Sequence, residues 1–272
     1  MYEINDVRRF WDSNPLFSGE SAKAVGSKEF FEHHSDVYYR DVFAGRLDDR
    51  LFSGRLDGSV LDLGCGIGFW LVELWKRGAR DIIGVDISAV SAALAKTRCN
   101  LYGVKAKLMV GNAENLPLHD NSFDHINCQG VIHHTPRPEQ AVFEICRILR
   151  PGGSALISVY YKNIVLSGWP LLRHLVRFLP IGLSGRGRDR LSSMKTVDDL
   201  VRYYDGADNP IGKCYSKDDF ISLLRPLVVK DVFYHFFPAR ALPVRIPGFL
   251  HRRTERVIPF MIFANVIKPA DL

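Results

Sequence analysis

The sequence predicts an α/β protein with a doubly wound, seven-stranded sheet that is mostly parallel, with an antiparallel last strand and a helical insertion. Two observations indicate this fold. From residue 59 onward, short apolar runs alternate with longer helical patterns, which is typical of βαβ units and a parallel sheet. The first run leads into a glycine-rich turn at residues 64–68, and the alternation breaks after residue 160 before two more apolar runs.

The apolar patterns place each element in chain order. Strands are expected at residues 59–63, 81–86, 106–110, 123–129, 154–160, 228–237 and 260–268. Helices are expected at residues 69–77, 89–102, 138–149 and 217–224. The helix at 138–149 has proline at its start and a Pro-Gly-Gly turn after it, and Ser216 is the expected N-cap of the helix at 217–224.

Composition and charge narrow the class of protein. The 272 residues are 47% hydrophobic and 24% charged, which argues against a disordered chain, a collagen or a coiled coil. The net charge of +6 is local: residues 1–160 carry 18 Lys or Arg against 20 Asp or Glu, whereas residues 161–256 carry 17 against 9. A nucleic-acid partner is therefore not favoured by charge alone.

Five scattered cysteines form no C-x-x-C pair, which indicates reduced thiols. The N-terminus lacks the apolar run of a signal peptide, and no stretch approaches the ~18 apolar residues of a membrane span. We therefore expect a cytoplasmic protein. No carboxylate-rich magnesium site is evident, and we expect no bound metal.

The glycine-rich turn suits a nucleoside ligand. A buried strand that ends in such a turn and continues into a helix lets backbone N–H groups approach a ligand closely. The dinucleotide-binding pattern would need a third glycine at position 69, where the chain has Phe69, so NAD is disfavoured. Asp86 ends the second strand, where a carboxylate can accept hydrogen bonds from both ribose hydroxyls.

These residues and three further motifs resemble the class I S-adenosylmethionine-dependent methyltransferases. The further motifs are Gly111-Asn112-Ala113-Glu114-Asn115-Leu116-Pro117, Phe123-Asp124 and Leu149-Arg150-Pro151-Gly152-Gly153. The resemblance covers roughly residues 58–160 and is closest to the small-molecule branch that includes ubiquinone and menaquinone methyltransferases. It implies a Rossmann-like core with S-adenosylmethionine as cofactor.

The resemblance also implies which residues bind the cofactor. The turn at residues 64–68 would hold the methionine portion, Asp86 would hold the ribose, and residues 112–114 would border the adenine. Asn112 stands where the family commonly has Asp, but an amide carbonyl can still accept from the adenine amino group. The expected cofactor-binding residues are Asp62, Gly64, Cys65, Gly66, Gly68, Asp86, Ile87, Asn112, Ala113, Glu114 and Gln129.

The sequence patterns and the resemblance together divide the chain into four parts. Residues 1–57 are expected to form an N-terminal helical lid segment, and residues 58–160 the cofactor-binding core. Residues 161–215 would form an insertion on the substrate side. Residues 216–272 would supply the final helix and strands that complete the core.

Two adjacent histidines are the candidate catalytic residues. Methyl transfer by in-line displacement needs a base only if the acceptor arrives protonated. His133 and His134 follow the fourth strand, at the carboxyl edge where ligands of such sheets bind. The alternative is that one histidine packs against the strand end while the other is solvated. Trp11, Tyr39 and Tyr160 are the candidate acceptor contacts, with ordinary packing as their alternative.

The leading hypothesis is methyl transfer to a small-molecule acceptor: quinone-like, lipid or natural product. One alternative is a nucleic-acid methyltransferase, suggested by the pI of about 9.1. It is weakened because Asn127-Cys128-Gln129-Gly130 lacks the Asn/Asp-Pro-Pro-aromatic pattern of exocyclic amino methylation. Another is a non-catalytic S-adenosylmethionine-binding protein.

Basic residues in the insertion suit an acidic or amphiphilic acceptor or peripheral contact with a membrane, or else form a solvated face. They are Arg173, Arg177, Arg186, Arg188 and Arg190. The sequence leaves the oligomeric state open.

Overall fold

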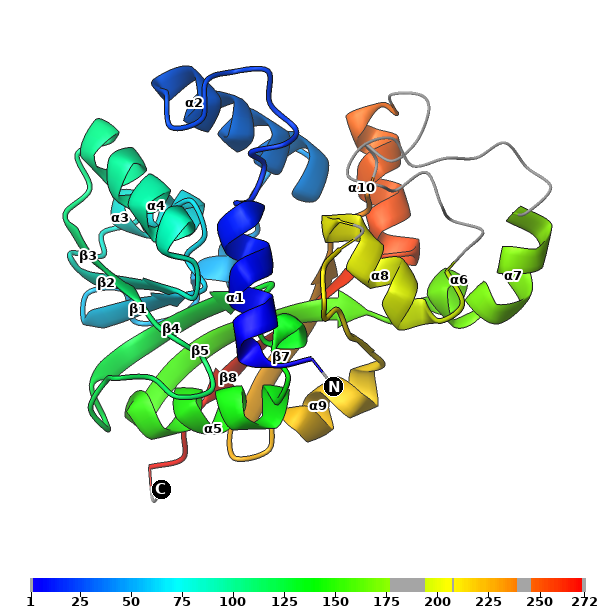
Figure 1. Ribbon diagram of the computed structural model, residues 1–272. Helices are drawn as coiled ribbons and strands as arrows, with labels where there is room; N and C mark the ends of the chain where they lie inside the picture. The colour runs from blue at the N-terminus through cyan, green and yellow to red at the C-terminus, as the bar shows by residue number, and fades with distance from the viewer. Residues whose placement is uncertain (1, 177–193, 207, 239–245, 271–272) are drawn as a thin grey trace.

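The computed structural model describes residues 2–176, 194–206, 208–238 and 246–270 (Figure 1). Its centre is a sheet with the order β3-β2-β1-β4-β5-β8-β7. The first five of these in the chain are β1 (Ser59–Leu63), β2 (Asp81–Asp86), β3 (Ala106–Val110), β4 (Phe123–Gln129) and β5 (Leu149–Tyr161). They are followed by β7 (Val228–His235) and β8 (Met261–Ile267).

The predicted sheet is confirmed. Strands β1 to β5 pair in parallel, and β8 runs antiparallel to both of its neighbours, β5 and β7. The count of seven strands is wrong by one, because the two-residue strand β6 (Cys214–Tyr215) pairs in parallel with the end of β5. A strand of two residues has no periodicity that the sequence could reveal.

Helices cover both faces of the sheet. Helices α3 (Phe69–Lys76) and α4 (Ala89–Leu101) belong to one apolar cluster. Helices α5 (Pro138–Ile148) and α9 (Lys217–Leu223) belong to the other. Figure 1 shows α3 and α4 on the opposite side of the sheet from α5 and α9. The Ser216 side chain accepts a hydrogen bond from the Asp219 N–H, so the predicted N-cap of α9 is confirmed.

The N-terminal residues form α1 (Ile4–Ser13) and α2 (Lys28–Val37), followed by a π-helical turn at Tyr38–Val42 and a 3-10 turn at Asp49–Phe52. Helix α1 contacts α4, and Phe10 lies beside Gly206. The N-terminal segment therefore bridges the nucleotide-binding half of the sheet and the insertion.

The insertion contributes α6 (Ile164–Ser167), α7 (Trp169–Val176) and α8 (Val197–Asp205), and α10 (Gly248–Val257) lies between β7 and β8. Of the predicted basic residues, Arg177, Arg186, Arg188 and Arg190 lie outside the described residues, while Arg173 lies on α7. Within the described ranges, no helix is long and apolar enough to cross a membrane.

Candidate active site

A cavity of about 220 Å³ lies at the carboxyl edge of the parallel strands. Three parts of the chain line it: the N-terminal segment, the strand ends and the insertion. Of the predicted residues, eleven line it: Trp11, Gly64, Gly66, Asp86, Ile87, Asn112, Ala113, Gln129, His133, His134 and Tyr160. The lining does not include Tyr39, Asp62, Cys65, Gly68 or Glu114.

The glycine-rich turn has a backbone that only glycine adopts readily. Gly64, Gly66 and Gly68 have φ of 73°, 51° and 82°, and the N–H groups of Gly64 and Cys65 donate to the Val85 carbonyl at 2.7 and 3.0 Å. A Cβ on Gly64 would lie 2.2 Å from Val131 Cγ2, whereas a Cβ on Gly66 would meet no described atom within 4 Å. The backbone at Gly66 therefore borders open space in the cavity.

Asp86 is held at the cavity wall by two backbone donors. Its Oδ2 accepts from the Gly66 N–H at 2.8 Å, and its Oδ1 accepts from the Ser88 N–H at 2.9 Å. Burial raises the pKa of Asp86 to about 6, although these two hydrogen bonds oppose the rise. Each carboxylate oxygen retains a lone pair, so Asp86 can still accept from a pair of hydroxyl groups.

A chain of hydrogen bonds runs from Asp62 to the cavity. Asn127 Nδ2 donates to Asp62 Oδ1 at 2.7 Å, and Gln129 Nε2 donates to Asn127 Oδ1 at 2.7 Å. Asp62 is 1% exposed, and its Oδ2 has no partner among the described residues. Burial raises the pKa of Asp62 to about 7. Of these three residues, Gln129 alone lines the cavity, and one of its two amide N–H groups donates to Asn127.

The loop after β3 forms the expected adenine side. Asn112 and Ala113 line the cavity, and Asn112 Oδ1 accepts from the Glu114 N–H at 3.0 Å. Glu114 is buried and accepts from Arg137 Nε at 3.0 Å and from the Arg137 N–H at 2.5 Å. Glu114 therefore fixes the loop to the start of α5 and does not line the cavity.

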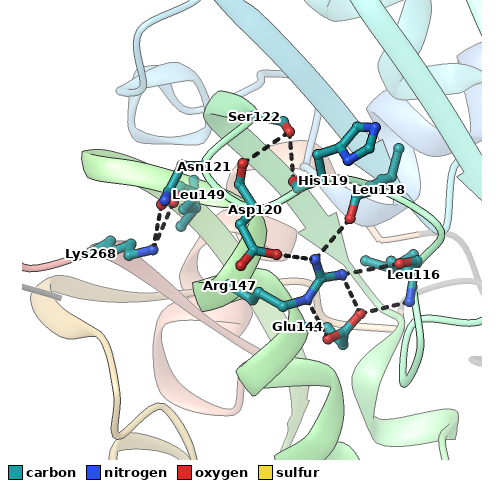
Figure 2. Close-up of polar contacts among 10 residues, drawn as sticks. All are labelled: Leu116, Leu118, His119, Asp120, Asn121, Ser122, Glu144, Arg147, Leu149 and Lys268. Atoms are coloured by element: carbon teal, nitrogen blue, oxygen red, sulfur yellow. Dashed lines mark hydrogen bonds and ion pairs between the residues drawn. The ribbon is translucent and has the colours of Figure 1, made fainter.

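Arg147 on α5 ties down the rest of this loop (Figure 2). Its guanidinium donates to the carbonyls of Leu116 and Leu118 at 3.0 and 2.8 Å and to Asp120 Oδ1 at 2.6 Å. Glu144 pairs with Arg147 and accepts from the Leu116 N–H at 2.7 Å. The side chains of α5 thus satisfy the loop's backbone groups, which fixes the path of the chain after Ala113.

The two histidines have different surroundings. His133 is fully buried, lines the cavity, and neither of its ring nitrogens makes a well-aligned hydrogen bond to a described residue. Burial, followed by the neighbouring His134, holds the pKa of His133 well below its usual range. His134 Nδ1 lies 2.7 Å from the Ile211 carbonyl, and its Nε2 lies 3.3 Å from Asp205 Oδ2.

The insertion supplies site residues that the sequence analysis missed. Asp205, the last residue of α8, accepts from the Tyr160 hydroxyl at 2.6 Å, and its neighbour Tyr204 also lines the cavity. The only local signal was the capping box at Thr196, which marks the start of α8.

Aromatic side chains from the N-terminal segment complete the wall. Trp11 lines the cavity and makes an edge contact with the His134 ring, with centroids 5.4 Å apart. Tyr38 lines the cavity, whereas its neighbour Tyr39 packs edge-on against Phe69 and hydrogen bonds with Glu73. The structure therefore places Tyr38, and not Tyr39, among the residues that could meet a ligand.

These residues fit S-adenosylmethionine. The turn at Gly66 leaves room for a ligand, the Asp86 carboxylate has free acceptor capacity for ribose hydroxyls, and Asn112 and Ala113 border the same cavity. Among the described ranges, no group of three or more His, Cys, Asp or Glu side chains could hold a metal ion.

Comparisons with known proteins agree with this geometry. Residues 61–157 match a family described as "Methyltransferase domain". The chain is 28% identical over 179 residues to a ubiquinone biosynthesis O-methyltransferase of Azoarcus sp., a match that covers 60% of this chain and 73% of that protein. It is 37% identical over 97 residues to a demethylmenaquinone methyltransferase of Lactiplantibacillus plantarum, covering 34% of this chain and 41% of that protein.

The chain spans about half or less of the length of several other curated relatives. Its fold is similar to that of a chain in the complex between the Haloferax volcanii Trm112 methyltransferase activator and a methyltransferase, with a TM-score of 0.61 and 19% identity over 97% of both chains. With the glycine-rich turn, Asp86 and the sheet topology, these matches show that residues 61–157 form a methyltransferase domain of the S-adenosylmethionine-dependent kind.

Proposed function

We propose that this enzyme transfers the methyl group of S-adenosylmethionine to a small-molecule acceptor that is apolar and quinone-like. The observation that carries the proposal is the wall of the cavity. Beyond the residues expected to hold the cofactor, the lining is rich in aromatic side chains, beside aliphatic ones and a few polar ones such as Glu20 and Asp205. The aromatic residues are Trp11, Phe17, Tyr38, Phe43, Tyr160, Tyr204, Phe236 and Phe263. Such a lining suits a flat, apolar ligand.

The surroundings of the cavity support a small acceptor over a polymer. Helix α1 contributes Val7 and Trp11, and the end of α8 contributes Tyr204 and Asp205, so segments far apart in sequence wall the same space. A nucleic-acid enzyme would instead need a groove lined by Lys or Arg along the path of the phosphates. No Lys or Arg of the described residues lines this cavity. The names of the two quinone methyltransferase relatives point the same way.

The protein residues have modest chemical tasks in this reaction. The cofactor supplies a methyl group on a sulfonium, which is already a good leaving group. The turn at Gly64–Gly66 and the carboxylate of Asp86 would orient it, and the aromatic wall would exclude water and hold the acceptor in line. Orientation and exclusion of water are the main contributions that we assign to this chain.

Calorimetry and a methyl-transfer assay test the proposal. The wild-type enzyme should bind S-adenosylmethionine and should methylate members of a panel of hydroxylated quinones and phenols, but not total cellular RNA. Asp86→Ala should abolish both the binding of S-adenosylmethionine and the methyl transfer. Asp81→Ala is the matched control, because Asp81 lies at the opposite end of the same strand β2 and is exposed. Methylation of RNA with none of the small acceptors would overturn the proposal.

A further inference from the structure

A buried arginine connects helix α4 of the core to helix α2 of the N-terminal segment. We propose that Arg98 of α4 is a positioning residue for methyl transfer: it holds His34 of α2, and His34 orients the aromatic wall that binds the acceptor. This inference rests on the proposed function and deepens it, because it names a residue outside the cavity that sets the affinity for the acceptor. Arg98 itself is not part of the cavity lining.

Among the described residues, the hydrogen-bond partners of the Arg98 guanidinium all belong to α2. Its Nη2 donates to the Ser35 hydroxyl at 2.5 Å and to the Phe31 carbonyl at 3.4 Å, and its Nη1 lies 3.3 Å from His34 Nδ1. Since a guanidinium can only donate, His34 Nδ1 is the acceptor and the ring proton is on Nε2. Arg98 thus fixes both the place and the tautomer of His34.

The surroundings of Arg98 make it a costly residue for packing alone. It is 1% exposed, its Nε has no partner among the described residues, and the nearby carboxylate of Glu73 pairs with Lys76 and Arg77 instead. Burial lowers the pKa of Arg98 to about 10, so the side chain is still cationic at neutral pH. Aromatic ring centroids lie 5.3, 5.5 and 5.8 Å from the guanidinium carbon. An apolar side chain of similar volume would fill such a site at less cost, so stability alone does not explain an arginine here.

His34 carries this contact to the cavity. It lines the cavity and is 2% exposed, and its ring stacks on that of Tyr38, with centroids 5.3 Å apart and 19° between the planes. The Phe17 ring meets the His34 ring edge-on, with centroids 5.2 Å apart. Phe17 and Tyr38 also line the cavity. A shift or rotation of His34 would therefore move two rings of the wall that we assign to the acceptor.

Helix α4 holds the N-terminal segment at two separate places. At its N-cap, the Ser88 hydroxyl donates to Asp12 Oδ1 of α1 at 2.8 Å, and the Ser88 N–H donates to Asp86, the expected ribose ligand. Arg98 lies about 15 Å further along the helix axis and contacts α2. Because Arg98 is remote from Asp86 and contacts the wall through His34, its loss should affect acceptor binding much more than cofactor binding.

The first test compares two ligands by calorimetry: S-adenosylhomocysteine, and then 2-naphthol with the enzyme saturated in S-adenosylhomocysteine. Arg98→Met should bind S-adenosylhomocysteine within about threefold of wild type but 2-naphthol about five- to tenfold more weakly, the range expected for one lost hydrogen bond. Arg98→Lys keeps the charge and a donor, and should recover part of the naphthol affinity. Lys96→Met is the matched control, because it removes the same charge from an exposed position of the same helix, and it should match wild type with both ligands.

A double-mutant cycle tests whether Arg98 acts through His34. His34→Phe keeps a ring beside Tyr38 but removes the acceptor for Arg98, and it should weaken naphthol binding to a similar extent. The double variant with Arg98→Met should bind 2-naphthol no more weakly than the weaker single variant, because both changes break the same contact. Additive losses would overturn the proposal. If Arg98→Met does not fold, Arg98→Lys takes its place in the cycle and should cause no further loss in the His34→Phe background.

Two further measurements distinguish positioning from a merely structural role. In ¹⁵N NMR spectra, the His34 ring of wild type should have a protonated Nε2 and an unprotonated Nδ1, and Arg98→Met should convert it to a mixture of tautomers. In turnover, Arg98→Met should raise the KM for the acceptor about five- to tenfold, while kcat and the KM for S-adenosylmethionine stay within about threefold of wild type. An unchanged tautomer in Arg98→Met would contradict the proposal.

The outcomes separate the two proposals. A wild-type enzyme that does not bind S-adenosylmethionine, or that binds none of the small acceptors, overturns the proposed function and this inference with it. If wild type binds both ligands and Arg98→Met binds 2-naphthol equally well, this inference alone is overturned. Equal losses of affinity for S-adenosylhomocysteine and 2-naphthol in Arg98→Met would also overturn it, because Arg98 would then support the fold as a whole.

Discussion

The Asp86 carboxylate and the Gly66 backbone are joined by a 2.8 Å hydrogen bond from the Gly66 N–H to Asp86 Oδ2. This bond links the glycine-rich turn after β1 to the end of β2. It holds the carboxylate at the cavity wall without occupying its remaining lone pairs. The glycine-rich turn and the carboxylate at the end of β2 therefore form one structural unit.

The affinity for S-adenosylmethionine should depend on pH through Asp86. Its carboxyl group has a pKa of about 6 in the ligand-free protein, and the ionised form is the better acceptor for ribose hydroxyls. Affinity should therefore be constant above about pH 7 and fall by up to about tenfold per pH unit below pH 6. Asp86→Asn should bind about tenfold or more weakly and show a flatter pH profile. Calorimetry between pH 5 and 8 measures both, and identical profiles for the two proteins would refute the assignment.

Local signals predicted the strands and the glycine-rich turn on the expected cofactor side of the cavity. The strand, the turn and Asp86 lie within residues 59–86, and their glycines and apolar residues have few alternative structures. The distinction between Tyr38 and Tyr39 was not accessible, because a π-helical turn begins at Tyr38 and changes which side chain faces the cavity.

The insertion was predicted to lie on the substrate side, but the residues by which it lines the cavity could not be predicted. Asp205 meets Tyr160 across 45 residues of chain, and the contact depends on how α8 packs and not on any local pattern. The position of Asp62, which was expected to bind the cofactor, also depends on packing and not on a local pattern. Its placement behind Asn127 and Gln129 follows from the register of β1 against β4, where Asp62 is opposite Asn127.

Asp62 should make the stability of the ligand-free protein depend on pH. Its folded-state pKa of about 7 exceeds the model-peptide value of 3.8, so the folded protein holds a proton that the unfolded chain releases between these values. Stability should therefore fall as pH rises through this window. The side chain of Asp62→Asn stays neutral at every pH. This variant should therefore be more stable than wild type only at high pH, by about 2 kcal/mol or about 5 °C in Tm at pH 8. Thermal unfolding at pH 4 and pH 8 measures this difference, and an equal effect at both pH values would contradict it.

Substitutions in the glycine-rich turn should separate folding from binding. Gly64→Ala introduces a Cβ 2.2 Å from Val131 Cγ2 at a positive φ, and should destabilise the fold by about 2 kcal/mol or more. Gly66→Ala also has a positive φ but no described atom within 4 Å of the new Cβ, so it should cost only about 1 kcal/mol. Its Cβ would occupy cofactor space and weaken S-adenosylmethionine binding.

Urea unfolding and calorimetry distinguish these two effects. Val131→Ala should partly restore the stability of Gly64→Ala, because it removes the methyl group that the new Cβ meets. The same change should not restore cofactor binding in Gly66→Ala. Equal losses of stability in the two single variants would show that strain at positive φ, and not the contact with Val131, limits this turn.

Arg147 should stabilise the loop that borders the adenine side of the cavity. Figure 2 shows its guanidinium between Glu144, Asp120 and the carbonyls of Leu116 and Leu118. Arg147→Met keeps much of the side-chain volume but leaves the buried part of Glu144 without its cationic partner. The free energy of unfolding should therefore fall by about 2–3 kcal/mol. Arg147→Lys should recover only part of it, because an ammonium cannot match the planar fork.

The double variant with Glu144→Gln identifies the origin of the loss. If the ion pair between Arg147 and Glu144 accounts for most of the lost stability, Glu144→Gln should lower the free energy of unfolding much less in the Arg147→Met variant than in wild type. The same loop carries the residues that we expect to border the adenine, so S-adenosylmethionine should also bind a few-fold more weakly to Arg147→Met. Additive losses of stability would instead show that the two side chains act independently, and that the contacts of Arg147 with the carbonyls of Leu116 and Leu118 fix the loop.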